Sequence, residues 1–313
     1  MNRRDLVKAV IAHQATERVP FCISFTPDGE ARLQELIGPR SARDFVDNDI
    51  VQVSVPWWGW HQLGPEWPQM APPASTATVL GSGSYPAFFE SLKMLRDNSD
   101  KYILAMIYGS HFEKAYFARG LENFLADLAG DPPFARKLLN RIIEKNMVML
   151  ENFLCAPELD GVLLGSDWGT QLDLIMSPAT WQELIRPGEQ REYDLVHAYR
   201  KDVWVHSCGN VEKIIPSLID MGLDVLNPVQ PEAMDIAMLK ERYGDRLTFW
   251  GGISTQRALP FGTPEEVKQE ARRVRDLMSR NGGYILAPAQ EIQGDVPAAN
   301  IMALIEVARE CAP

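Results

Sequence analysis

The chain has 313 residues, of which 46% are hydrophobic, and a formal net charge of -11. An acidic surface of this kind argues against nucleic acid or an anionic membrane as the main partner. No apolar run approaches the roughly 18 residues of a membrane span, and the amphipathic opening MNRRDLVKAVIAHQ lacks the apolar core of a signal peptide. We therefore expect a cytoplasmic protein that does not use a membrane. The four cysteines form no C-x-x-C pair and do not indicate a disulfide framework.

Short apolar runs recur along the chain, and each ends in polar, Gly or Pro residues before a helical pattern begins. Runs of this kind, bounded by turn signals, are typical of strands buried on both faces. The eight predicted strands are Val19–Phe25, Ile50–Pro56, Tyr102–Tyr108, Gly161–Ser166, Val203–His206, Asp224–Val229, Leu247–Trp250 and Tyr284–Ala287.

The segments between these runs carry helix signals. Apolar residues at a spacing of three to four predict helix over Glu122–Phe153, and an S-P start predicts helix over Pro178–Tyr199. Thr263–Arg280 opens with T-P-E-E, a capping box, and Pro297–Ala308 is a second Pro-led helix. Residues 57–90, rich in Trp, Pro, Gly and Ser, are interpreted as a long loop over the mouth of a barrel.

Eightfold alternation of strand and helix is the pattern of a closed parallel barrel. The fold prediction is therefore α/β, a single (β/α)8 TIM barrel in which residues 1–313 form one domain. An open doubly wound sheet is the competing architecture. That fold usually carries a Gly-rich phosphate loop after its first strand, and the stretch TPDGEARL has no G-x-G-x-x-G.

The strongest local signal for chemistry is the segment VWVHSCGN. Active sites of such barrels lie at the C-terminal ends of the strands, and His206 and Cys208 stand two apart at such an end. Residues i and i+2 of an extended segment point the same way, so both can reach one ion. Imidazole with thiolate suits zinc. The alternative is a small buried Cys beside a hydrogen-bonded core His, because H-x-C alone is a common pattern.

Other strand ends supply further candidates. Asp167 follows DGVLLGS directly and is a candidate acid, base or cation ligand, with satisfaction by loop amides as the alternative. Gln171 lies in the same loop. Gln230 and Trp250 end apolar runs and are expected to line the cavity.

Two sets of candidates fall in predicted loops. Trp57 and Trp58 offer a flat apolar surface for a large planar ligand or partner, with a loop packed by its own aromatics as the alternative. His111 and Glu113 are interpreted as surface-loop residues, and a role in the site is their alternative.

Several segments together resemble the uroporphyrinogen decarboxylase superfamily. They are RRDLVKAVIAHQATERVP, DGVLLGSDWGTQLDLIMSP, HSCGNVEKIIPSLIDMGLDVLNPVQ, LTFWGGISTQRALPFGTPEEV and GGYILAPAQEIQGDVPAANI. The resemblance implies a (β/α)8 barrel with its site in the C-terminal mouth. It also implies one of two chemistries: porphyrinogen decarboxylation without a cofactor, or zinc-dependent methyl transfer to or from a corrinoid.

The arginine content separates the two chemistries. True uroporphyrinogen decarboxylases carry an Arg-rich R-Q-A-G-R segment just after the first strand, which holds the many carboxylates of the substrate. The corresponding stretch here is FCISFTPDGEARLQ, whose only arginine is Arg32. An octa-anionic substrate would be poorly held without such a clamp, so we expect negligible activity on uroporphyrinogen.

The corrinoid methyltransferase branch carries an H-x-C motif, which His206 and Cys208 match, and a third zinc ligand in an I-L-A-P-G-C segment. This chain reads ILAPAQE, with Gln290 in place of that Cys and Glu291 beside it. Three outcomes are open for the third zinc ligand. It is an oxygen of Glu291 or Gln290, or another strand-end carboxylate supplies it, or the site binds no metal.

The predicted function is a zinc-dependent methyltransferase that moves a methyl group between a small methylated substrate and a corrinoid (cobalamin). A zinc with few thiolates is more electrophilic, which favours demethylation. The chain has no D-x-H-x-x-G motif, so the corrinoid would arrive on a partner protein. The alternatives are a cofactor-free decarboxylase of a small acid and a non-catalytic barrel that binds a corrinoid or tetrapyrrole. The sequence leaves the oligomeric state open, with a homodimer among the alternatives.

Overall fold

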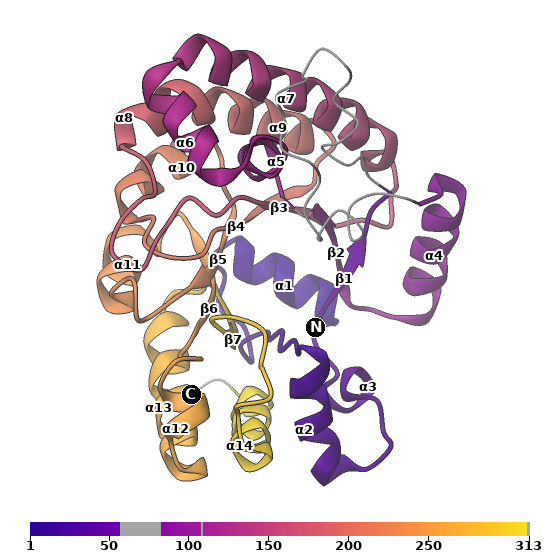
Figure 1. The fold of residues 1–313 in the computed structure, drawn as a ribbon. Helices are drawn as coiled ribbons and strands as arrows, with labels where there is room; N and C mark the ends of the chain where they lie inside the picture. The colour runs from indigo at the N-terminus through magenta and orange to yellow at the C-terminus, as the bar shows by residue number, and fades with distance from the viewer. Residues whose placement is uncertain (57–82, 108, 312–313) are drawn as a thin grey trace.

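A curled parallel β-sheet forms the centre of the protein (Figure 1). The structure is a computed structural model that describes residues 1–56, 83–107 and 109–311. Within these residues seven strands pair in chain order, each parallel to the next. They are β1 (Ile50–Ser54), β2 (Tyr102–Ile107), β3 (Gly161–Gly165), β4 (Asp202–His206), β5 (Val225–Val229), β6 (Thr248–Ile253) and β7 (Tyr284–Pro288).

Helices connect the strands and pack on the outer face of the sheet, whereas the first helix lies near its centre (Figure 1). The described α-helices are α1 (Arg3–Ile11), α2 (Pro27–Ile37), α3 (Ala42–Val46), α4 (Tyr85–Asn98), α5 (His111–Arg119), α6 (Leu121–Gly130), α7 (Pro132–Leu154), α8 (Pro178–Thr180), α9 (Arg186–Ala198), α10 (Ile215–Asp220), α11 (Ile236–Tyr243), α12 (Ala258–Phe261), α13 (Pro264–Met278) and α14 (Ala298–Ala308). A π-helical turn, η3 (Trp181–Ile185), and a 3₁₀ turn, η4 (Glu212–Ile214), complete the described helical elements.

The expected first strand, Val19–Phe25, is not a strand in the structure. It lies between β7 and the start of β1 and makes only isolated bridges, such as Phe21 to Leu286. The cause is a competing side chain: the carboxylate of Asp49 accepts the Phe21 N–H at 2.9 Å, while the Asp49 N–H donates to the Phe21 carbonyl at 3.1 Å. Seven of the eight predicted strands are therefore confirmed, and the predicted closed barrel of eight strands is, within the described residues, a curled parallel sheet of seven. Val19–Phe25 contacts this sheet through single bridges.

Aromatic side chains fill the inside of the curled sheet. The ring of Trp204 lies 5.3 Å from that of Tyr102 and 5.3 Å from that of Trp250, the latter pair edge to face. Val7 and Val10 of α1 belong to the same buried cluster, so α1 covers the end of the sheet at which the strands begin. This packing leaves the opposite, C-terminal end of the strands for a site.

One helix prediction and one loop prediction need correction. The segment Glu122–Phe153 forms two helices, because Gly130 ends α6 and Asp131 caps α7 ahead of two prolines. The predicted loop 57–90 lies partly in α4, whose N-cap is Ser84. Trp57 and Trp58 lie outside the described residues, and so does the rest of the 57–82 segment.

Other local predictions are confirmed. Ser177 caps α8, and the Thr263–Glu266 capping box is present at the start of α13. The predicted helix over Pro178–Tyr199 is present as α8, η3 and α9 in succession. None of the described helices combines the length and hydropathy needed to cross a bilayer.

Candidate functional site

The register of neighbouring strands brings the candidate metal ligands to one level of the sheet. In the strand register, Gly165 of β3 pairs with His206 of β4, and His206 pairs with Asn227 of β5. Asp167 follows β3 by two residues and Cys208 follows β4 by two residues, so both stand just above this level. The sheet therefore brings residues far apart in sequence to one point at its C-terminal end.

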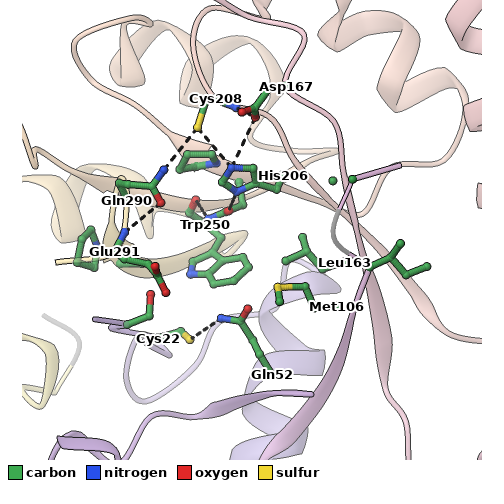
Figure 2. Close-up of a pocket in the computed structure, with 18 of the residues that line it drawn as sticks. Cys22, Gln52, Met106, Leu163, Asp167, His206, Cys208, Trp250, Gln290 and Glu291 are labelled. Carbon is green, nitrogen blue, oxygen red and sulfur yellow. Dashed lines mark hydrogen bonds and ion pairs between the residues drawn. The ribbon is translucent and has the colours of Figure 1, made fainter. Parts of the chain in front are cut away.

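Asp167, His206 and Cys208 form a compact group at this point (Figure 2). The His206 Nε2 atom lies 3.4 Å from the Cys208 Sγ atom and 3.7 Å from the Asp167 Oδ1 atom. The three ligand atoms lie within 4.8 Å of one another. The Cys208 N–H also donates to Asp167 Oδ1 at 2.8 Å, which ties the loop after β3 to the loop after β4.

Asn227 sets the tautomer of His206. The Asn227 Nδ2 group donates to the Trp250 carbonyl at 3.2 Å, so Asn227 Oδ1 faces His206 and accepts from His206 Nδ1 at 2.7 Å. The proton is therefore held on Nδ1, and Nε2 presents its lone pair toward Cys208 and Asp167. This arrangement is the usual support of a metal-binding histidine. Sequence reasoning missed Asn227, although a polar residue inside a buried apolar strand is a usable signal.

The donor set fits zinc. Ligands of a tetrahedral zinc lie about 3.3–3.8 Å apart, given zinc–ligand bonds of about 2.0–2.3 Å. The two distances measured from His206 Nε2 agree with that spacing. Burial raises the pKa of Cys208 to about 12, and the negative charge of Asp167 contributes to the shift. A cation at this point would reverse the effect, because metal binding deprotonates a coordinating thiol.

Two glycines allow the β3 and β4 loops to approach this closely. A Cβ atom on Gly169 would lie 2.5 Å from the Cys208 carbonyl oxygen. Gly209 has φ +79°, and a Cβ there would lie 2.5 Å from the Thr170 carbonyl oxygen. A side chain at either position would separate the two loops, and with them Asp167 from Cys208.

A cavity of about 350 Å³ opens beside the group. Met106, Leu163 and Trp250 form an apolar part of its wall (Figure 2). Three carboxylates, those of Glu113, Asp167 and Glu291, also line it, and none of its described lining residues is Lys or Arg. The cavity has the size of a small-molecule site and an acidic wall.

The two residues expected to supply a third ligand lie at the edge of this group. Gln290 donates its Nε2 hydrogen to Cys208 Sγ at 3.6 Å. Figure 2 shows the Glu291 carboxylate on the side of Trp250, away from Cys208. Burial raises the pKa of Glu291, an effect that His206 partly offsets. Within the described residues, the carboxylate grouped with His206 and Cys208 is that of Asp167.

Gln230 and Gln171 are brought together next to the cavity. Gln230 Nε2 donates to Gln171 Oε1 at 3.2 Å, and Gln230 Oε1 accepts from the Gly209 N–H at 3.3 Å. Both line an adjoining hollow of about 510 Å³ that shares Cys208, Gln290 and Glu291 with the first cavity. Their catalytic role stays a prediction.

The interpretation of His111 and Glu113 as surface-loop residues is wrong. Both lie on α5, where His111 is fully buried and Glu113 is 7% exposed. Glu113 lines the cavity, and burial, followed by the charge of Asp167, raises the pKa of its carboxyl to about 7. The sequence signal was the position of Glu113 directly after a strand and at the start of a helix, which places it at the mouth.

His111 belongs to a second buried group with Glu189 and Glu192. Its Nε2 donates to the Ile185 carbonyl at 3.1 Å, and its Nδ1 lies 3.0 Å from Glu189 Oε1. Burial lowers the pKa of His111, but the two glutamates outweigh it and the net shift is upward. The group is a buried charge network behind the cavity wall.

The chain matches one sequence family, described as "Uroporphyrinogen decarboxylase (URO-D)", over residues 67–311. No curated protein sequence matches it significantly. Among solved structures, a methyltransferase from Methanosarcina mazei shares the fold with a TM-score of 0.72 at 17% identity, covering 98% of both chains. The YdhT protein from Bacillus subtilis superposes with a TM-score of 0.51 at 11% identity, covering 95% of this chain and 86% of that one. These likenesses establish the fold, and the match over most of the sequence shows that the chain belongs to the uroporphyrinogen decarboxylase family.

Proposed function

We propose that this protein is a zinc-dependent methyltransferase that moves a methyl group between a small methylated substrate and a corrinoid carried by a partner protein. The observation that carries the proposal is the convergence of Asp167, His206 and Cys208 on one point beside a cavity. A His/Cys/carboxylate set leaves a fourth zinc position for substrate, as catalytic zinc sites require. The fold shared with a methyltransferase is compatible with this activity.

Each residue of the group has a separate part in the proposed site. Asn227 holds the proton on His206 Nδ1, so that Nε2 stays available as a ligand. The Cys208 N–H keeps Asp167 oriented toward the same point. Zinc bound there would act as a Lewis acid on the methyl donor. Because only one ligand is a thiolate, the ion would stay electrophilic, which supports demethylation of the small substrate as the direction of transfer.

The wall of the cavity disfavours uroporphyrinogen as the substrate. That substrate carries many carboxylates, and the cavity presents three carboxylates and no described Lys or Arg. Like charges this close would oppose binding strongly. The same repulsion disfavours a cofactor-free decarboxylase of a small acid. We expect turnover of uroporphyrinogen by the purified protein to be undetectable in a porphyrin fluorescence assay.

Zinc stoichiometry tests the proposal directly. The purified protein should bind one zinc, and His206→Ala, Cys208→Ser and Asp167→Asn should each lose it after dialysis against a mild chelator. Glu291→Gln and Gln290→Ala should retain it, which separates Asp167 from the two other candidate ligands. His197→Ala is the matched control, because His197 lies on α9 and pairs with Asp224 outside the cavity.

Methyl transfer itself is measured with reduced cobalamin and a panel of methylated compounds, by the change in cobalamin absorbance. Formation of methylated cobalamin that depends on both zinc and His206 is the expected result. An unmodified protein that binds no zinc would remove the main support for the proposal.

A further inference from the structure

The charge of the cavity is unbalanced. Glu113, Asp167 and Glu291 line it, and its only described basic residue is His206. The segments outside the described residues, 57–82, 108 and 312–313, contain no Lys or Arg in the sequence, so they cannot supply a permanent cation. Lys114 is buried nearby and interacts electrostatically with Glu113 and Glu192, but its ammonium group donates to the Gly109 carbonyl and the residue is not part of the lining.

A bound zinc would not neutralise the excess negative charge of the cavity wall. The two positive charges of the ion would be matched by the Cys208 thiolate and the Asp167 carboxylate. Glu113 and Glu291 would remain as acidic groups facing the same space. Buried carboxylates are costly unless a cation or several hydrogen bonds compensate them. Among the described residues, the Glu113 side chain accepts one hydrogen bond, from the Tyr116 hydroxyl at 3.1 Å.

The side chain of Trp250 is a second unusual feature of the cavity wall. Its side chain lines the cavity and the residue is 4% exposed (Figure 2). Its indole N–H is buried and has no hydrogen-bond partner within the described part of the chain. An aromatic surface beside carboxylates attracts organic cations, because the face of an indole is negative. The indole N–H is thus a buried donor that no described acceptor satisfies.

We propose that the ligand of this cavity is an N-methylated ammonium cation, of a size that fits about 350 Å³, held by Glu113, Glu291 and the indole of Trp250. This inference goes beyond the proposed function and concerns binding alone. An ammonium nitrogen has no lone pair to offer zinc, so the wall of the cavity holds the cation and the inference stands apart from the Lewis-acid role proposed for the ion.

Three probes of nearly the same shape isolate the effect of charge. Choline carries a trimethylammonium group, 3,3-dimethylbutan-1-ol replaces its nitrogen with carbon, and 3,3-dimethylbutanoate is an anion of similar size. Isothermal titration calorimetry on the purified protein should find choline bound about tenfold or more tightly than the neutral alcohol. The anion should bind more weakly than the alcohol.

Variants of the two glutamates test whether they cause the preference for choline. Glu291→Gln and Glu113→Gln should each reduce the preference for choline over the alcohol several-fold, while leaving the alcohol affinity unchanged. Retained binding of the alcohol also shows that the variants are folded. Glu151→Gln is the control, because Glu151 is exposed on the outer helix α7.

Equal binding of choline and the neutral alcohol would overturn the inference. So would a preference for choline that survives in both glutamine variants. Neither result bears on the methyltransferase proposal, which depends on zinc retention by Asp167, His206 and Cys208. Conversely, a protein without zinc that still prefers choline would contradict the proposed function and keep the cation site.

Discussion

His206 and Asn227 are joined by a hydrogen bond of 2.7 Å from the imidazole Nδ1 to the amide oxygen, across neighbouring parallel strands. Asn227 cannot rotate freely, because its amide nitrogen also donates to the Trp250 carbonyl. One strand therefore orients the Nε2 atom of a histidine on another toward Cys208 and Asp167. If zinc binds there as proposed, its affinity should depend on Asn227, a residue that does not touch the ion.

Replacing Asn227 with Ala should weaken zinc binding by about 10- to 100-fold, the usual effect of removing the partner of a ligating histidine. The physical reason is loss of the fixed tautomer and ring orientation. Competition against a chromophoric chelator measures the affinity. Asn152→Ala, at an exposed position of α7, is the control and should leave it unchanged. Unaltered zinc affinity in Asn227→Ala would show that His206 is oriented by other contacts.

Gly209→Ala should destabilise the protein by about 2 kcal/mol or more, because the new Cβ adds left-handed backbone strain and a contact with backbone. The affected atom is the Thr170 carbonyl oxygen, 2.5 Å from the ideal Cβ position. Zinc affinity should fall as well, since Cys208 is adjacent. Urea unfolding measures the loss of stability. Gly130→Ala is the matched control: a Cβ there has no neighbour within 4 Å, so its stability should be unchanged or slightly higher.

Glu113 should make stability depend on pH. Burial raises its pKa from 4.5 to about 7 in the folded protein. Between these values the folded state holds a proton that the unfolded state has released, so stability falls as pH rises from about 4.5 to 7 and then levels off. Glu113→Gln should flatten this decline, which amounts to a few kcal/mol at most.

The measurement is urea unfolding of metal-free protein at intervals between pH 4.5 and 8. Glu151→Gln serves as the control and should follow the unmodified protein. If Glu113→Gln and the unmodified protein lose stability in parallel over this range, the carboxyl of Glu113 titrates normally and the assignment is wrong.

Asp160 is expected to be the most sensitive carboxylate at the N-terminal end of the sheet. Its side chain is fully buried, and it accepts from Arg4 at 2.5 Å, from Arg96 at 2.7 Å and from the Ile103 N–H at 2.8 Å. Removing it leaves the buried Ile103 N–H without this acceptor and takes an ion-pair partner from Arg4 and from Arg96, so Asp160→Ala should cost about 3 kcal/mol or more. Asp245→Ala, at a side chain 78% exposed, should change stability by less than about 0.5 kcal/mol. Thermal or urea unfolding measures the free energy of unfolding of both variants.

The sequence by itself determined the alternation of buried strands and helices, because that order depends on local patterns of apolar residues and helix caps. The S-P start at Ser177 and the T-P-E-E start at Thr263 needed only neighbouring residues, and both caps are present. The spacing of His206 and Cys208 likewise placed both side chains at one strand end. The status of Val19–Phe25 could not be read locally, because Asp49, from a distant loop, takes the Phe21 N–H.

Tertiary structure decided which residues share the site. The carboxylate that lies within reach of both His206 and Cys208 is that of Asp167 and not that of Glu291, because strand register and loop contacts set that distance. Gln290 contacts Cys208 through its amide nitrogen. The role of Asn227 follows from the register of β4 against β5. Glu113 became a buried wall residue only through the packing of α5 against the mouth of the sheet. Sequence patterns report periodicity along the chain, whereas a metal site depends on distances between segments that only the folded sheet brings together.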